Sequence, residues 1–176
     1  REAGAWLAIR TNDGADAISR EELTQFTFRG ERLPLVDRGR GIRKPAICQA
    51  ALSIMTVHTP DGRSRPYEDV RGPDGLPRYK ARGDALGTAE NLAVMRAMEL
   101  RLPLIWLVGV APGWFQTITP VFVIAPEPEL SQFVLAYDAA QTLPIPDSPF
   151  ESVLRRYAMR ETRQRLHQPV FRSMVM

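Results

Sequence analysis

The chain has 176 residues, 44% of them hydrophobic, which is enough for one domain with a substantial buried core. No run approaches the roughly 20 consecutive apolar residues of a membrane-spanning helix, and no signal peptide is visible. The single cysteine, Cys48, excludes an internal disulfide. These features exclude an integral membrane protein and a disulfide-rich secreted domain, and they predict a cytoplasmic protein with no membrane partner.

The charged residues are segregated along the chain. Residues 29–82 carry twelve Lys and Arg against six Asp and Glu, whereas residues 83–150 carry two against seven. From residue 151 onward, six arginines stand against two glutamates. Because Lys and Arg neutralise phosphates, this segregation favours an oriented contact with a polyanion. A solvated surface on which the charges cluster by chance is the alternative.

The first half of the chain predicts short elements joined by loops. Residues 2–10 and 19–26 are expected to be helices, and Ser19 with Glu22 forms a capping box at the start of the second. Residues 26–36 indicate a small hairpin or extended arm, and residues 37–44 a basic loop. A strand is expected over residues 52–57, followed by a long turn-rich loop over residues 60–77.

The second half predicts more sheet. A short strand is expected at residues 78–82, and a helix over residues 88–100 with Thr88 as its N-cap. Three strands, at residues 104–110, 117–124 and 132–137, then read as a β-meander. Prolines at positions 144, 146 and 149 indicate a linker before an arginine-rich helix. The pattern predicts a mixed α+β domain with a strongly bent sheet or partial barrel.

An ordered set of motifs lies between residues 39 and 125. Its segments are Ser53-Ile54, Pro66-Tyr67-Glu68-Asp69, residues 72–75, residues 78–83, Asn91-Leu92-Ala93, Leu102-Pro103-Leu104 and Val121-Phe122-Val123. This set resembles the SRA family, also called YDG domains, which read methylated cytosine by flipping it out of the duplex. The resemblance implies a bent sheet or partial barrel of the SRA–PUA type, with flanking helices and a C-terminal linker helix.

Three further stretches bear on the kind of protein, namely residues 30–35, 72–76 and 160–172. They resemble proteins in which such a reader precedes an HNH nuclease domain. The resemblance implies the specificity module of a modification-dependent (type IV) restriction endonuclease, a hydrolase of phage defence. We expect an N-terminal helical segment at residues 1–28, the reader at 29–143 and a linker at 144–176. With no Cys-x-x-Cys pair in the sequence, the nuclease domain is expected to lie outside it.

The base pocket is expected to form around two tyrosines and a carboxylate. A flipped base needs stacking faces and hydrogen bonds to its Watson–Crick edge. Tyr67 and Tyr79 are the candidates for stacking. Asp69 is the candidate acceptor for the cytosine amino group, and Arg82 is expected to contact the phosphate of the flipped nucleotide. The alternative is that both tyrosines anchor loops and that Asp69 caps a turn.

Two positions depart from the family pattern. Val70 stands where the family has the carboxylate that reads the base, and Ala81 stands near its second pocket aromatic. Either Asp69 takes over the carboxylate role, or the recognised group differs from 5-methylcytosine. Hydroxymethylcytosine, phosphorothioate DNA, or RNA bound on a PUA-, ASCH- or EVE-like fold therefore remain alternatives.

Further cations around the pocket are expected to bind the DNA backbone, and Gly39 and Gly41 to allow its close approach. The alternative is a solvated basic loop. The candidate DNA-binding residues are Arg38, Arg40, Arg43, Lys44, Arg63, Arg65, Arg71, Arg78 and Lys80.

No residues of this sequence form a recognisable catalytic or metal site. His58 and His167 lie far apart in the sequence and have no Cys, Asp or His at ligand spacing. We therefore expect no metal, no cofactor and no catalytic residue in this chain, and modified double-stranded DNA as the partner. A homodimer formed through the full-length protein is left open. A protein-interaction module whose basic face docks an acidic partner is the alternative from a different class.

Overall fold

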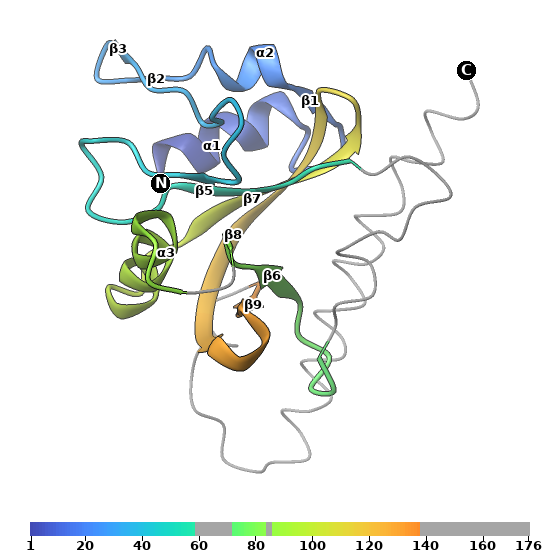
Figure 1. Ribbon diagram of the computed structural model, residues 1–176. Coiled ribbons are helices and arrows are strands. Elements are labelled where there is room, and N and C mark those ends of the chain that lie inside the picture. Colours follow the sequence, from blue (N-terminus) through green and yellow to red (C-terminus); the bar gives the residue numbers. More distant parts are fainter. Residues whose placement is uncertain (59–71, 84–85, 138–176) are drawn as a thin grey trace.

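The computed structural model describes residues 1–58, 72–83 and 86–137 (Figure 1). Helices and strands alternate irregularly along these residues. In chain order they are α1 (Glu2–Arg10), β1 (Ile18–Ser19), α2 (Arg20–Leu23), β2 (Thr27–Phe28), β3 (Glu31–Arg32), β4 (Ile42–Arg43), β5 (Ser53–Thr56), β6 (Arg78–Lys80), α3 (Ala89–Glu99), β7 (Leu104–Ala111), β8 (Trp114–Glu127), a 3-10 turn (Pro128–Leu130) and β9 (Gln132–Ala136).

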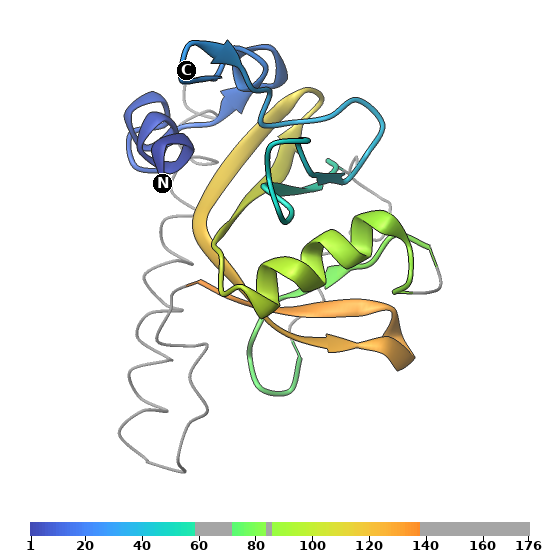
Figure 2. The ribbon, with the colours of Figure 1, turned by 90° about the vertical axis from the view of Figure 1, so that its left-hand side faces the viewer.

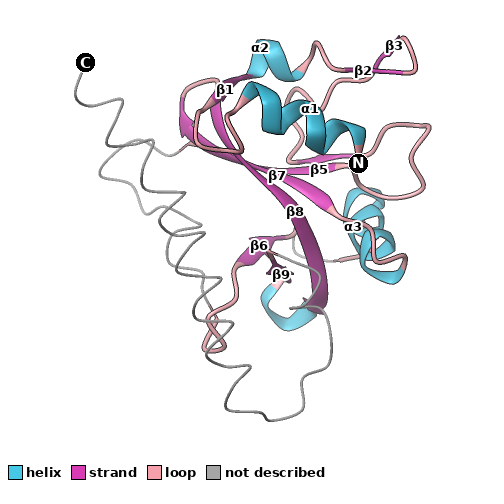
Figure 3. Cartoon of the chain, turned by 180° about the vertical axis from the view of Figure 1, so that it is seen from behind, coloured by secondary structure: helices cyan, strands magenta, loops and turns pink. Residues whose placement is uncertain are grey.

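The described strands form one curled seven-stranded sheet and a separate hairpin of β2 and β3. The sheet order is β4-β5-β7-β8-β9-β6, with β1 paired to the start of β8. Only β5 and β7 run parallel among these pairs. The 14-residue β8 pairs first with β7 and then with β9, and its register shifts between the pairs at Val123 and Ala125. Such irregularities bend a strand, and the sheet curls into a half-barrel (Figure 3).

The predicted mixed α+β class with a strongly bent sheet is therefore confirmed. The expected β-meander is also confirmed, since β7, β8 and β9 are successive antiparallel neighbours. The expected strands at residues 52–57 and 78–82 and the hairpin within residues 26–36 are present as β5, β6 and the β2–β3 pair. β4 lies within the expected basic loop. It consists of only two residues, which pair with Ile54 and Ser53 of β5.

The two faces of the sheet carry different helices, as Figure 2 shows for α1 and α3. Successive side chains of a strand point to opposite faces. Ile54 and Trp106 therefore belong to the core cluster that includes α3, whereas the adjacent Met55 and Ile105 belong to the cluster that includes α1. β5 and the first four residues of β7 are buried on both faces, which explains their continuous apolar sequence.

The N-terminal helices pack directly on the sheet. Ser19 and Glu22 form the predicted capping box, with both reciprocal hydrogen bonds present. The second helix is shorter than expected. It ends at Leu23, where the chain turns and places Phe26 against Trp6 with ring centroids 5.5 Å apart. Buried residues from both sides of the expected boundary at residue 28 share one core cluster.

Helix α3 agrees with its prediction. The side chain of Thr88 accepts a hydrogen bond from the backbone N–H of Asn91, which is the expected N-cap. No helix among the described residues is long and apolar enough to cross a membrane. The expected linker and arginine-rich helix, at residues 144–176, lie outside the described residues.

Candidate nucleic-acid interface

The basic loop, residues 37–44, presents three cations to solvent. Arg38, Arg40 and Lys44 are exposed. Gly39 lies in the left-handed region, with φ +74°, and an added Cβ would meet no atom within 4 Å. Glycine adopts this conformation without the steric cost that other residues carry. The turn at Gly39 therefore depends on glycine for its backbone conformation and is open to solvent.

The loop is braced at Gly41. The backbone N–H of Met55 donates to the Gly41 carbonyl at 2.6 Å, and the Tyr79 hydroxyl donates to the same oxygen at 2.9 Å. A Cβ at position 41 would lie 2.9 Å from the Tyr79 hydroxyl oxygen. Because position 41 has no side chain, Tyr79 of β6 can approach the basic loop closely and bond to it, although the two residues lie 38 positions apart in the sequence.

The outer part of the loop is organised by Asp37. Its carboxylate accepts hydrogen bonds from the Arg38 backbone N–H at 2.8 Å and from Arg43 Nη1 at 3.4 Å. Its carbonyl accepts from Arg20 Nη1 at 3.0 Å. Arg43 also donates to the Pro34 carbonyl. Of the loop cations expected to contact DNA, Arg43 is thus engaged in holding the loop.

Tyr79 does not occupy the stacking position expected from the sequence. It is 3% exposed and belongs to the core cluster beneath α3. The reason is its place in the sheet: β6 pairs with β9, so that Tyr79 lies opposite the fully buried Phe133. The ring is covered by other apolar side chains, and we assign Tyr79 to bracing the basic loop rather than to stacking on a base.

Arg78 likewise differs from the expected phosphate-binding role. It is 4% exposed, and its guanidinium donates to both carboxylate oxygens of Asp74 at 3.0 Å and to both of Glu127 at 2.9 Å. The Leu76 carbonyl accepts a further bond at 2.9 Å. A Cβ at Gly72 would lie 2.3 Å from Arg78 Nη2, so a larger residue at this position would require the guanidinium to shift.

The Arg78 network also shifts the acidities of its carboxyl groups. Partial burial acts to raise the pKa of Asp74, but the hydrogen bonds from Arg78 and the Leu76 amide outweigh it and lower that pKa below its usual range. Hydrogen bonds from Arg78 and Gln132 lower the pKa of Glu127. We therefore assign Arg78 to a structural ion-pair network that joins β6 to the end of β8.

Arg82 lies beside the basic loop, in a turn held by a buried asparagine. Asn91 is fully buried, accepts a 2.9 Å hydrogen bond from the Arg82 backbone N–H and donates a 3.0 Å bond to the Arg82 carbonyl. The Arg82 side chain is exposed and pairs with Glu90. Arg40 reaches the same Glu90 oxygen at 4.0 Å. The basic loop, the Arg82 turn and the start of α3 thus meet at one place.

Neither Glu90 nor the bracing role of Asn91 was anticipated from the sequence. Asn91 shares a helix face with Val94, three residues further on, and a polar residue on an apolar face was the available signal for a buried hydrogen-bonding role. Lys80, another expected DNA contact, is exposed, and its Nζ donates to the Leu130 carbonyl at 2.9 Å.

Replacing Asn91 with alanine is expected to lower the free energy of unfolding by about 2 kcal/mol, because the two partly buried backbone groups of Arg82 lose the partner that Asn91 supplies. Urea unfolding followed by circular dichroism measures the change. Leu92→Ala is the matched control, since Leu92 is on the same helix but exposed, and it should change stability by about 0.5 kcal/mol or less. Equal effects of the two substitutions would contradict the bracing role.

The remaining expected site residues lie in one segment, and the residues that flank it on both sides are described. Residues 59–71, which contain Tyr67, Asp69, Arg63, Arg65 and Arg71, are outside the described residues. The segment begins just after β5, which pairs with β4 and bonds to Gly41 through Met55. It ends at Gly72, against the strand whose Tyr79 bonds to Gly41. Both ends therefore lie at strands that hold the basic loop.

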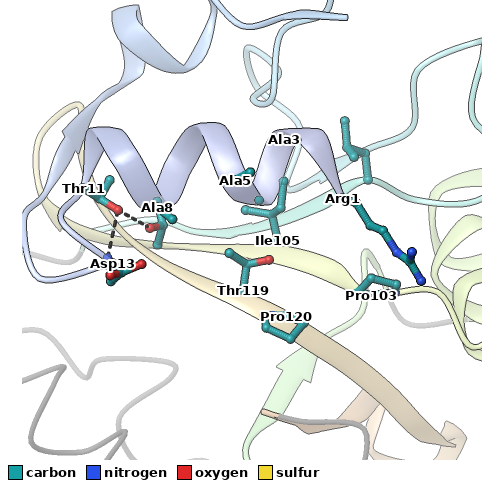
Figure 4. Close-up of a pocket in the computed structure, with 14 residues that line it drawn as sticks. Arg1, Ala3, Ala5, Ala8, Thr11, Asp13, Pro103, Ile105, Thr119 and Pro120 are labelled. Carbon is teal, nitrogen blue, oxygen red and sulfur yellow. Dashed lines mark hydrogen bonds between the residues drawn. The ribbon is translucent and has the colours of Figure 1, made fainter.

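A separate cleft of about 670 Å³ lies between α1 and the sheet (Figure 4). Its lining is mostly small or apolar, including Ala5, Ala8, Ile105 and Pro120, with Arg1 at one end. It lies on the α1 face of the sheet and contains none of the expected pocket residues.

Within residues 1–58, 72–83 and 86–137, no group of three or more His, Cys, Asp or Glu side chains is arranged to hold a metal ion. Comparison with known proteins gave no match, whether with a family model, a curated protein or a solved structure.

Proposed function

We propose that this chain binds double-stranded DNA and recognises 5-methylcytosine by taking the base out of the duplex. In this proposal it is the specificity part of an HNH-type modification-dependent restriction endonuclease, on a sheet of the SRA–PUA type. The observation that carries the proposal is the position of the basic loop. The loop carries the exposed cations Arg38, Arg40 and Lys44. At Gly41 its backbone bonds to β5, which precedes the segment with Tyr67 and Asp69, and to β6, which follows that segment.

Each part of this arrangement has a role in the proposal. The exposed cations of the loop neutralise DNA phosphates and fix the register of the protein on the duplex. Tyr67 supplies the stacking face for the extruded base, and Asp69 accepts from the cytosine amino group. Arg82 contacts the phosphate of the flipped nucleotide. Tyr79 and Asn91 hold the two loops that carry these cations.

The structure supports this division because the bracing side chains of Tyr79 and Asn91 are buried while the cations are exposed. Rigid support beneath an exposed polar loop is the usual design of a binding site, since an ordered loop loses less conformational entropy when it binds. The buried Tyr79 leaves Tyr67 as the proposed stacking residue, so the proposal depends more strongly on Tyr67 than the sequence suggested.

Matched duplexes with and without one 5-methylcytosine test the proposal. We expect the chain to bind the methylated duplex about tenfold more tightly in a fluorescence anisotropy titration, the range of discrimination that base contacts provide. Tyr67→Ala and Asp69→Ala should each remove most of this preference. Tyr67→Phe keeps the aromatic face and is the matched control, so it should retain the preference.

Equal affinity of the unmodified and methylated duplexes would remove the methylcytosine proposal and leave DNA binding in place. Hydroxymethylcytosine, phosphorothioate and RNA versions of the same sequence are included in the titration. A preference for one of these would identify a different ligand for the same face.

A further inference from the structure

One carboxylate lies between the two exposed arginines that border the proposed DNA-binding face. Glu90, in the first turn of α3, pairs with Arg82 from the turn after β6 and with Arg40 from the basic loop. Both contacts involve the same glutamate oxygen, Oε1. The Glu90 side chain is 20% exposed, whereas Arg40 and Arg82 are 59% and 53% exposed.

The three side chains do not balance one another. Two guanidinium groups, each with five N–H donors, share one carboxylate, and a net positive charge remains. The Arg40 contact is 4.0 Å long, at the outer limit of an ion pair, so most of the donors of Arg40 stay available to solvent. A negatively charged group with several oxygens would satisfy the two arginines better than one glutamate does.

We infer that Glu90 occupies the position of a DNA phosphate between Arg40 and Arg82, and that it competes with the DNA backbone for these two arginines. This inference rests on the proposed function, because it takes DNA as the polyanion. In the free protein Glu90 pairs with both arginines. It also limits affinity, since an approaching phosphate meets the like charge of Glu90.

The direction in which DNA affinity changes when Glu90 is neutralised separates competition from simple positioning. If Glu90 competes with phosphate, its neutralisation strengthens DNA binding. If Glu90 only positions Arg40 and Arg82, its neutralisation loosens both arginines and weakens DNA binding. If the ion pair is purely structural, neutralising Glu90 leaves DNA affinity unchanged, because exposed pairs of this kind contribute little to stability.

Glu90→Gln tests the inference, with Glu99→Gln as the matched control. Glu99 lies on the same helix, is exposed and pairs with Arg96 at 2.8 Å. Both substitutions remove one negative charge; Glu99→Gln breaks one ion pair and Glu90→Gln breaks two. Relative to Glu99→Gln, we expect Glu90→Gln to bind duplex DNA about threefold more tightly at low ionic strength, with the difference shrinking as salt is added. Glu90→Ala, measured in parallel, should show the same direction.

The gain should disappear when the two arginines are absent. Added to an Arg40→Gln, Arg82→Gln double variant, Glu90→Gln should change DNA affinity no more than Glu99→Gln does. Equal or weaker binding by Glu90→Gln than by Glu99→Gln in the otherwise native chain would overturn the inference.

Failure of this inference can be distinguished from failure of the proposed function. If the chain binds DNA without preferring the methylated duplex and Glu90→Gln still strengthens binding, the inference stands and the methylcytosine proposal fails. If the chain prefers the methylated duplex but the two glutamine variants behave alike, only the inference fails. Absence of DNA binding in every variant would overturn both, and tighter binding to an RNA duplex would overturn DNA as the ligand.

Discussion

Arg78→Met is expected to lower the free energy of unfolding by about 3 kcal/mol, because two carboxylates lose their shared cation. The guanidinium of Arg78 is almost completely buried and makes five hydrogen bonds, four of them to Asp74 and Glu127. Breaking a buried ion pair from one side costs roughly 3–5 kcal/mol. Asp74 and Glu127 are partly exposed, so water offsets some of the loss and the expected value lies at the lower end.

Arg96→Met is the matched control for this substitution. Arg96 pairs with Glu99 at 2.8 Å on the exposed side of α3, and about half of each side chain is accessible to solvent. Its loss should change the free energy of unfolding by about 0.5 kcal/mol or less. Chemical unfolding of the three proteins measures both values. Comparable stability of Arg78→Met and Arg96→Met would show that the network contributes no more than a surface pair.

The Arg78 network also predicts how stability depends on pH. The pKa values of Asp74 and Glu127 are lowered in the folded state from their ordinary values of 3.8 and 4.5. A carboxyl group with a lowered folded pKa contributes stability above its unfolded pKa, and this contribution is lost as the pH falls through the folded pKa. The native chain should therefore lose stability on acidification in this range.

In Arg78→Met the two carboxyl groups lack the cation that lowers their pKa values. Protonation then costs the folded state less, so this variant should lose less stability on acidification than the native chain. The stability difference between the two proteins should be largest near about pH 6 and shrink toward about pH 3. Urea unfolding across this range measures it, and a difference that stays constant with pH would argue against the ion pairs as its source.

The parts of the fold that were predicted correctly depend on local signals. The capping box at Ser19 and Glu22, the N-cap at Thr88 and the apolar runs of β7 and β8 are each encoded within a few neighbouring residues. Such patterns specify a helix start or a buried strand regardless of what packs against it. The bent α+β class followed from the order of these elements.

The roles of Arg78 and Tyr79 could not be read from the sequence, because they depend on distant partners. Glu127 lies 49 positions from Arg78, and Gly41 lies 38 positions from Tyr79. An arginine and a tyrosine in a loop-rich basic segment look like surface residues until the sheet brings these partners next to them. Ion pairs and hydrogen bonds of this kind are set by strand order, here β9 between β8 and β6.

The candidate site was predicted in part. The sequence indicated the basic loop and the Arg82 turn as neighbours of one functional face, and the structure brings them together at Glu90. Nothing in the sequence indicated that a glutamate of α3 would join them. The glutamate appeared in the sequence as an ordinary first-turn acid, a position that helices favour for electrostatic reasons alone.

Replacing Arg38, Arg40 and Lys44 together with glutamine is expected to weaken binding to duplex DNA about 100-fold at low salt. These three side chains are the exposed cations of the basic loop, while Arg43 of the same loop is held by Asp37 and the Pro34 carbonyl. Each lost phosphate contact should reduce the slope of log affinity against log salt by about 0.9, so that the triple variant loses nearly three units of slope.

The triple variant should weaken binding to methylated and unmethylated duplexes alike, because phosphate contacts carry no information about the base. The matched control removes the same charge elsewhere, with Arg29, Arg96 and Arg101, all exposed, changed to glutamine. Both variants lower the net charge by the same amount. If binding depends only on a general electrostatic attraction, both should therefore lose the same DNA affinity. If the basic loop makes specific phosphate contacts, only the Arg38, Arg40, Lys44 variant should lose nearly three units of the slope of log affinity against log salt. Titrations at several salt concentrations decide between these two outcomes.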